Sequence, residues 1–194
     1  MSRLNLLAAI VASALSFAIL PAHSAEVATQ NDTARFLAGM EPSSGSPLVA
    51  LTKDRSWQEH AKAMDKAFAT IEKSTLAPIR DWSKENLKSP QKSMFYMFSG
   101  PDFLFANAFF PHASTYVLAA LEPAGEIPDL VKTHRRGGVS GLGHLQNSMR
   151  TLLQLSFFIT QEMRENIGGS GLRGTIPILY VFLARSGYQV LDTS

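Results

Sequence analysis

Apolar residues recur at helical spacing in the region that follows Ser56. The recurring positions are separated by four, three, four and three residues, which places them on one stripe of a helix. Ser56 and Glu59 form a capping-box pattern, in which the hydroxyl bonds a free N–H and the carboxylate reaches back, so the helix is predicted to begin at Ser56. The stripe consists of Trp57, Ala61, Met64, Phe68 and Ile71.

A second helix is predicted over Thr75–Leu87, where Leu76, Ile79 and Trp82 share one face. Pro78 fits the first turn of this helix, because the first N–H groups of a helix have no partner within it. The two amphipathic segments follow one another closely, so we expect them to pack as a helical hairpin that precedes the sheet.

Two short apolar runs with strand character flank a further helical segment. The first run, Ser93–Phe98, is rich in aromatic residues and lies between Pro90 and Gly100, so it is predicted to be a buried strand. The second predicted strand is Thr115–Leu121, and the segment between the two, Pro101–Phe110, is predicted to be a helix. About a dozen residues separate the strands, which is close to the minimum for a parallel crossover.

The remaining segments extend this α/β pattern. Ile176–Ala184 is apolar almost throughout, as in a strand covered on both faces, and Tyr188–Leu191 is a candidate last strand. Strands mixed with helices predict a small, mostly parallel or mixed sheet with flanking helices. The strand at Ile176–Ala184 needs neighbours on both sides, so either earlier strands supply them or the domain is C-terminally truncated. Other helices are predicted over Asp32–Leu37 (ended by Gly39), from Pro128 toward His134, from Ser140 or Gly141 to about Phe157, and over Thr160–Ile167, with a loop over Glu41–Pro47.

The N-terminus has the order of an export signal. Arg3 is the only charge in the first 25 residues, and an apolar run extends from Leu4 to Leu20. Small residues suitable for cleavage follow, which predicts a signal peptide over residues 1–24, cut after Ser24 or Ala25. We therefore expect a bacterial protein of the periplasm or the medium, with no stable membrane span after cleavage.

Length and charge narrow the class further. With 194 residues, the chain is expected to hold an arm and loop over residues 25–47 and a single domain over residues 48–194. The formal net charge is +2, and it falls to +1 when Arg3 leaves with the signal. A nearly neutral chain lacks the electrostatic footprint of a nucleic-acid-binding protein. The absence of cysteine excludes disulfides, thiolate metal sites, cysteine nucleophiles and a lipid anchor on cysteine.

Reactive side chains gather where the first predicted strand passes into a helix. In one interpretation Ser99 is a nucleophile, His112 is the base that takes its proton, and Asp102 orients that base. This interpretation lacks the second glycine of a nucleophile elbow. We favour the alternative, in which Ser99 caps the helix and Asp102 interacts with the positive end of the helix.

Gly100 and Glu122 permit a third interpretation. A glycine turn after one strand and an acidic residue after the next can hold the ribose of a dinucleotide or a related cofactor. The Gly-x-Gly-x-x-Gly pattern is absent and nucleotide cofactors are scarce outside the cytoplasm, so no cofactor is expected. No histidine pair has metal-ligand spacing, so no metal site is expected either, and His60 and His144 are predicted at solvent-facing edges of helices. A basic cluster at a helix end comprises Lys132, His134, Arg135 and Arg136.

The segments Phe98–Phe103 (Phe-Ser-Gly-Pro-Asp-Phe) and Tyr116–Pro123 (Tyr-Val-Leu-Ala-Ala-Leu-Glu-Pro) resemble a family of exported bacterial proteins with no assigned activity. The resemblance extends to Asn31–Gly39 and Leu179–Gly187, and so to most of the mature chain. It implies export, an α/β fold and relatives that continue beyond this C-terminus. It implies no activity and no catalytic residues.

These observations favour a non-enzymatic exported binding protein or envelope-associated protein, whose partner the sequence does not identify. The first alternative is an exported hydrolase that uses Ser99, Asp102 and His112. The second is a binder of nucleotide-type ligands at the corner of Gly100 and Glu122.

Overall fold

The computed structural model describes residues 28–89, 91–98, 102–120, 124–135, 141–155 and 174–191. The predicted signal peptide and the predicted helix over Thr160–Ile167 lie outside the described residues. Among the residues described, no helix combines the length and the apolar character needed to cross a bilayer.

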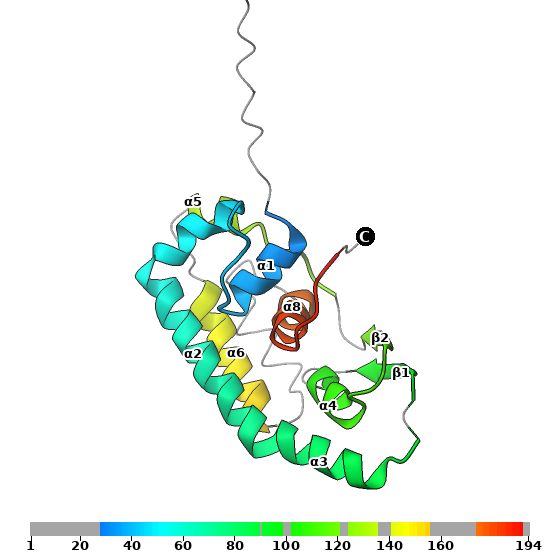
Figure 1. Ribbon diagram of the computed structural model, residues 1–194. Helices are drawn as coiled ribbons and strands as arrows, with labels where there is room; N and C mark the ends of the chain where they lie inside the picture. Colours follow the sequence, from blue (N-terminus) through cyan, green and yellow to red (C-terminus); the bar gives the residue numbers. More distant parts are fainter. Residues whose placement is uncertain are drawn as a thin grey trace, which may run out of the picture.

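A long bent helix forms one side of the molecule. Helix α2 (Arg55–Ile71) passes through a π turn, η2 (Glu72–Leu76), into α3 (Ala77–Asn86) without a loop (Figure 1). The predicted hairpin is therefore not confirmed, because the chain bends at this point and does not reverse. Pro78, in the first turn of α3, has no N–H to donate to the preceding turn, and the π turn accommodates the missing hydrogen bond.

The apolar stripe of α2 is confirmed. Trp57, Met64 and Ile71 are buried, and Ala61 and Phe68 pack partly against the core. The stripe faces the other helices, so the burial of these side chains holds α2 in place.

The start of α2 differs from the prediction. Asp54 is the N-cap residue, and the N–H of Gln58 donates to the Asp54 carbonyl at 3.0 Å, so the helix begins one residue before Ser56. Glu59 forms an ion pair with Arg55 at 2.8 Å in place of the predicted capping box. The predicted capping box is therefore wrong: the helix begins one residue earlier, its N-cap Asp54 makes no side-chain cap hydrogen bond, and the Glu59 carboxylate pairs with Arg55.

Helix α1 (Gln30–Leu37) confirms the predicted short helix, and Gly39 follows it with a φ of 68°. The predicted loop after it leads into a 3₁₀ helix, η1 (Pro47–Lys53). Asp32 in the first turn of α1 is buried and accepts hydrogen bonds from the Thr29 hydroxyl at 2.9 Å and the Ser43 N–H at 2.8 Å. Burial alone would raise the pKa of Asp32, but the hydrogen bonds from Ser43 and Thr29 outweigh it and hold the pKa below its ordinary value.

The predicted β-α-β unit is confirmed. Strand β1 (Ser93–Phe98) pairs in parallel with β2 (Thr115–Ala120), and α4 (Asp102–Phe109) forms the crossover between them. The register runs from Ser93 beside Thr115 to Phe98 beside Ala120. The protein is thus an α/β fold with a small parallel sheet and flanking helices, as the sequence predicts.

The apolar segment near the C-terminus is a helix, α8 (Ile176–Arg185), so the predicted strand over Ile176–Ala184 is wrong. A short, continuously apolar run is compatible with either a buried strand or a buried helix, and α8 lies within the helical layer beside α1 (Figure 1). Tyr188–Leu191 is not a strand either, and the Val190 N–H donates to the Asn31 side chain at 3.1 Å. The buried residues of α8 are Pro177, Ile178, Tyr180, Val181, Phe182 and Ala184.

Two further helices match their predictions closely. Helix α5 (Leu130–Arg135) begins after Asp129, whose carboxylate accepts from the Lys132 N–H at 2.9 Å. Helix α6 (Gly141–Leu155) packs against α2 and buries Leu142, Leu145 and Met149. The core therefore lies among α1, α2, α6 and α8 and continues into α4 of the β-α-β unit, which lies at one side of the molecule (Figure 1).

Candidate functional site

Of the five residues singled out by sequence, Ser99, Gly100 and Glu122 lie outside the described residues. Asp102 is in the first turn of α4, at the carboxyl end of β1, and is half-buried. Burial, together with the nearby charge of Asp102, raises the pKa of Tyr96 above its ordinary value. Asp102 therefore belongs to the side of the sheet on which α4 packs.

His112 is exposed in the turn that follows α4, shortly before β2 begins. Helix α4 has eight residues. At 1.5 Å per residue, it separates its two ends by about 12 Å. Asp102 and His112 thus lie at opposite ends of the crossover helix, and the structure does not bring together the orienting group and the base of the predicted catalytic trio.

His60 is fully buried, so its predicted place at a solvent-facing edge is wrong, whereas His144 is exposed as predicted. The Nε2 of His60 lies 2.8 Å from the Leu37 carbonyl oxygen, and the amide nitrogen of Gln146 lies 3.2 Å from Nδ1. Burial lowers the pKa of His60 against the opposing hydrogen bond to Leu37, and the positive charge of Arg185 lowers it further. His60 is therefore a neutral core residue that joins three helices.

Metal-binding groups do not gather in the described part of the chain, where no three histidine, cysteine, aspartate or glutamate side chains are placed to hold an ion. The predicted basic cluster does fall at the end of a helix, since α5 ends at Arg135. Its last member, Arg136, lies outside the described residues.

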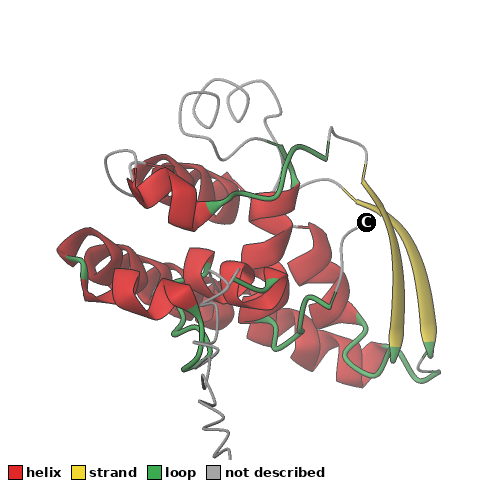
Figure 2. Ribbon diagram, turned by 90° about the horizontal axis from the view of Figure 1, so that it is seen from above, coloured by secondary structure: helices red, strands yellow, loops and turns green. Residues whose placement is uncertain are grey.

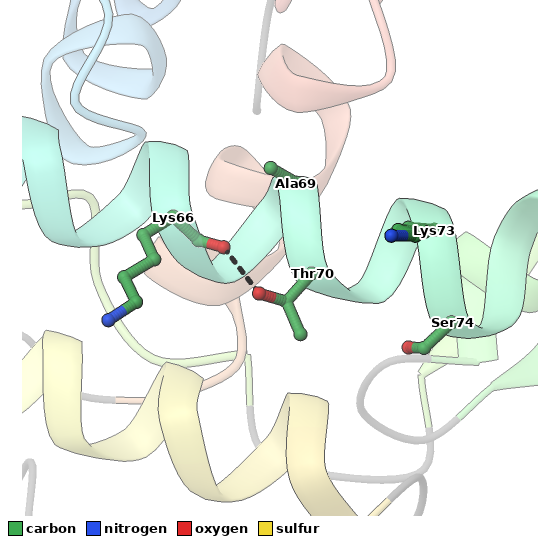
Figure 3. Close-up of a pocket in the computed structure, with 5 residues that line it drawn as sticks. All are labelled: Lys66, Ala69, Thr70, Lys73 and Ser74. Carbon is green, nitrogen blue, oxygen red and sulfur yellow. Dashed lines mark hydrogen bonds between the residues drawn. The ribbon is translucent and has the colours of Figure 1, made fainter.

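A solvent-open hollow of about 470 Å³ lies along α2 and the π turn (Figure 3). Its lining residues are all exposed and all come from this one helical stretch, and the Thr70 hydroxyl donates to the Lys66 carbonyl at 2.8 Å. A ligand site converges on its ligand from several elements and supplies a few enclosed polar groups. This hollow has neither property, although it carries two lysines. It is lined by Lys66, Ala69, Thr70, Lys73 and Ser74.

The two strands present one covered face and one open face. Side chains of alternate residues point to opposite faces of a sheet. On the covered face, the Phe103 ring of α4 packs edge-on against the Tyr116 ring, with centroids 6.0 Å apart, and Leu118 is partly buried. The Tyr116 hydroxyl donates to the Phe110 carbonyl at 2.6 Å, and burial, with a contribution from Tyr188, raises the pKa of Tyr116 to about 12.

The open face, here called the outer sheet face, carries large apolar side chains that are exposed. Phe95 is 78% exposed, Met97 is 72% exposed and Val117 is 48% exposed. The register places Phe95 beside Val117 and Met97 beside Ala119, so the apolar side chains form one continuous patch. Figure 2 shows the described helices on the other side of the strands. The outer sheet face consists of Ser93, Phe95, Met97, Thr115, Val117 and Ala119.

Helix α3 fixes the position of this face through α4. The Ser83 hydroxyl donates to the Phe109 carbonyl at 2.5 Å, and the rings of Trp82 and Phe109 meet edge-on at 5.9 Å. The outer sheet face is thus mounted on a packed helix pair. Contiguous exposed apolar patches on folded domains mark interaction sites more often than single exposed residues do.

The sequence predicted the strands of the outer sheet face but not the exposure of its side chains. The apolar, aromatic-rich run Ser93–Phe98 predicted a buried strand, and the covered face agrees with this. The exposure of Phe95 and Met97 does not agree with it, because the described part of the chain supplies a helix to one face only. The same apolar pattern is therefore the signal that identifies the site.

Searches of protein-family models, of curated proteins and of solved structures found no match for this chain. The resemblance carried by residues 98–103 and 116–123 therefore stays a prediction. Function is inferred from the geometry of the outer sheet face.

Proposed function

We propose that this is an exported, non-enzymatic binding protein that contacts another protein through the outer sheet face. The observation that carries the proposal is the exposure of Phe95, Met97 and Val117 side by side on a regular sheet. Each large apolar side chain contributes about 1.5–3 kcal/mol when it passes from water into a fully buried contact. Three such side chains in one patch therefore give this face an apolar driving force for contact.

Export is the second part of the proposal, and the apolar run from Leu4 to Leu20 supports it. Fractionation of the producing bacterium and N-terminal sequencing of the purified protein test this part. We expect the protein in the periplasm or the medium, with Ala25 or Glu26 as its first residue. A cytoplasmic protein that still carries residues 1–24 would contradict export.

The contact itself is tested by cross-linking in intact cells. A photoreactive phenylalanine analogue is placed at Phe95 or at Met97, and at Thr70 as a control that is exposed on α2 and is not part of the sheet. We expect a discrete adduct of one size from positions 95 and 97, and none from position 70. Equal adducts from all three positions, or no adduct from the strand positions, would contradict the proposal.

A further inference from the structure

We infer that the outer sheet face receives a single amphipathic helix of a partner protein, which lies antiparallel to the strands. This inference rests on the proposed function and names the kind of partner. It follows from the dimensions of the face, from the side chains it presents and from the charges at its amino end.

The dimensions of the face match one helix. A strand of six residues is about 20 Å long at 3.3 Å per residue, and two strands spaced about 4.8 Å apart present a surface about 10 Å wide. An α-helix with its side chains is about 10–12 Å in diameter, and about 14 residues of it span 20 Å. One helix of three to four turns therefore covers Phe95, Met97 and Val117 together.

A partner that adds a strand to the edge of the sheet fits the observed side chains less well. A partner strand added to a sheet edge would satisfy backbone groups there, but it would leave the side chains of Phe95 and Met97 in water. The exposed side chains thus favour a partner on the face over one at the edge.

The covered face shows which kind of element packs on these strands. Parallel strand pairs occur almost entirely with helices on both faces, and α4 already occupies one of them. Helix α4 begins at the carboxyl end of β1 and ends near the amino end of β2, so it runs antiparallel to both strands. A partner helix in the same direction completes a three-layer arrangement, with its carboxyl end at the amino end of the sheet.

Charges at the amino end of the sheet support this direction. Lys88 and Lys92, just before β1, are exposed, and neither forms an ion pair with a described residue. Glu85, near the end of α3, lies one turn before Lys88. The carboxyl end of a helix carries a partial negative charge of about half a unit, and acidic side chains in its last turn add to it. The two lysines therefore place positive charge at the end of the sheet where the carboxyl end of an antiparallel helix lies.

A peptide selection tests the inference and does not require the partner to be identified first. A display library of random peptides is selected against the full protein as isolated from cells, and peptides that also bind the double variant F95S/M97S are discarded. We expect the survivors to share apolar residues at positions i, i+3, i+4 and i+7, with acidic residues toward the carboxyl end. Survivors with apolar residues at every second position, or no survivors, would overturn the inference.

The direction and the charges are then tested with one selected peptide. We expect F95S/M97S to weaken its binding at least tenfold, and each of Lys88→Glu and Lys92→Glu to weaken it about two- to fivefold at low salt. Thr70→Glu, on α2, is the matched control and should leave binding unchanged. Equal weakening by Thr70→Glu, or tighter binding after the lysine reversals, would contradict the proposed orientation.

Failure of this inference differs from failure of the proposed function. If positions 95 and 97 form a specific adduct in cells while the selection yields strand-like peptides, the face binds a partner that is not a helix. If the purified protein sediments as a dimer that F95S/M97S dissociates, the occupant is a second copy. Both results overturn the helix inference and leave the outer sheet face as the binding surface.

Discussion

The Nε2 atom of His60 lies 2.8 Å from the carbonyl oxygen of Leu37, with the imidazole entirely shielded from solvent. A carbonyl oxygen only accepts, so Nε2 carries the proton and Nδ1 accepts from the Gln146 amide at 3.2 Å. The ring connects the end of α1 to α2 and α6 in its neutral form. If Nδ1 were also protonated, its N–H and the N–H of the Gln146 amide would be two donors facing each other in a buried site.

This arrangement predicts a pH-dependent stability. Burial lowers the pKa of His60 below its ordinary value of 6.5, so the unfolded chain takes up a proton that the folded chain does not bind. Above pH 6.5, His60 therefore causes no change in the free energy of unfolding. This free energy falls as the pH drops below 6.5, by up to about 1.4 kcal/mol per pH unit, until the folded-state pKa is reached. Urea unfolding at a series of pH values between 4.5 and 8 measures this pH dependence.

The variant His60→Gln supplies the control, because it removes the titrating group and retains polar atoms. We expect His60→Gln to be less stable at pH 8 by about 1–3 kcal/mol, through imperfect hydrogen bonding in the core. Its loss of stability between pH 6.5 and 4.5 should be smaller than that of the parent protein. Asp32, whose pKa is lowered from 3.8, contributes its own loss only at more acidic pH, so it does not enter this window. Equal slopes for the two proteins would refute the assignment.

Gly39 is predicted to tolerate no side chain. Its φ of 68° lies in the left-handed region, and a Cβ atom there would approach the Ala61 Cα to 2.7 Å. Gly39→Ala combines backbone strain with a clash against the backbone of α2, and should destabilise the protein by about 2–3 kcal/mol. Gly143→Ala, in α6, is the matched control, because its Cβ meets nothing within 4 Å and alanine favours a helix. Thermal unfolding of both variants decides the point.

The β-α-β unit could be predicted from sequence because its three segments are short, bounded by breakers and distinct in pattern. The segment Ile176–Arg185 could not, because a helix that is apolar on all sides shows no period, and its surroundings only become known from the fold. His60 was misplaced for a similar reason. The sequence shows on which side of α2 His60 lies relative to the apolar stripe. It does not show that α6, through Gln146, packs on that side.

The outer sheet face shows the same limit. The aromatic-rich apolar run assigned Phe95 and Met97 to a strand, but whether a further layer covers them depends on which other segments become helices that pack there. Of the predicted trio of Ser99, Asp102 and His112, the two described members, Asp102 and His112, lie at opposite ends of α4. Nearness in sequence does not show that a helix separates them. Both cases required the path of the chain in three dimensions.

Arg185 is predicted to contribute more through its hydrogen bond to the backbone than through its ion pair. Its Nε donates to the Ala38 carbonyl at 2.8 Å, and its Nη1 donates to Asp65 at 2.7 Å. The guanidinium also lies 5.2 Å from the centre of the Phe68 ring. Asp65 is 67% exposed, so Asp65→Ala should cost less than about 1 kcal/mol. Arg185→Met should cost about 1.5–3 kcal/mol, because the Ala38 carbonyl loses a charged donor. Similar losses in chemical denaturation of the two variants would contradict this ranking.

The two faces of the sheet should respond to truncation in opposite ways. Phe103, on the covered side, is buried against Tyr116 and Tyr188, and Phe103→Ala should destabilise the protein by about 3–5 kcal/mol. F95S/M97S removes side chains that already lie in water, so the free energy of unfolding should change by less than about 1 kcal/mol. A large loss of stability in F95S/M97S would mean that these side chains support the fold, and their exposure would no longer indicate a binding surface.

The hydrolase alternative makes a prediction that His112 decides. If Ser99 were activated by His112, a fluorophosphonate probe would label the protein, and His112→Ala would abolish labelling while Ser99→Ala removed its site. Helix α4 places Asp102 about 12 Å from the turn that holds His112, so we expect no labelling above that of the unfolded protein. Ser99→Ala should then retain its fold by circular dichroism. Stoichiometric labelling that both Ser99→Ala and His112→Ala remove would contradict this expectation and would establish the enzyme.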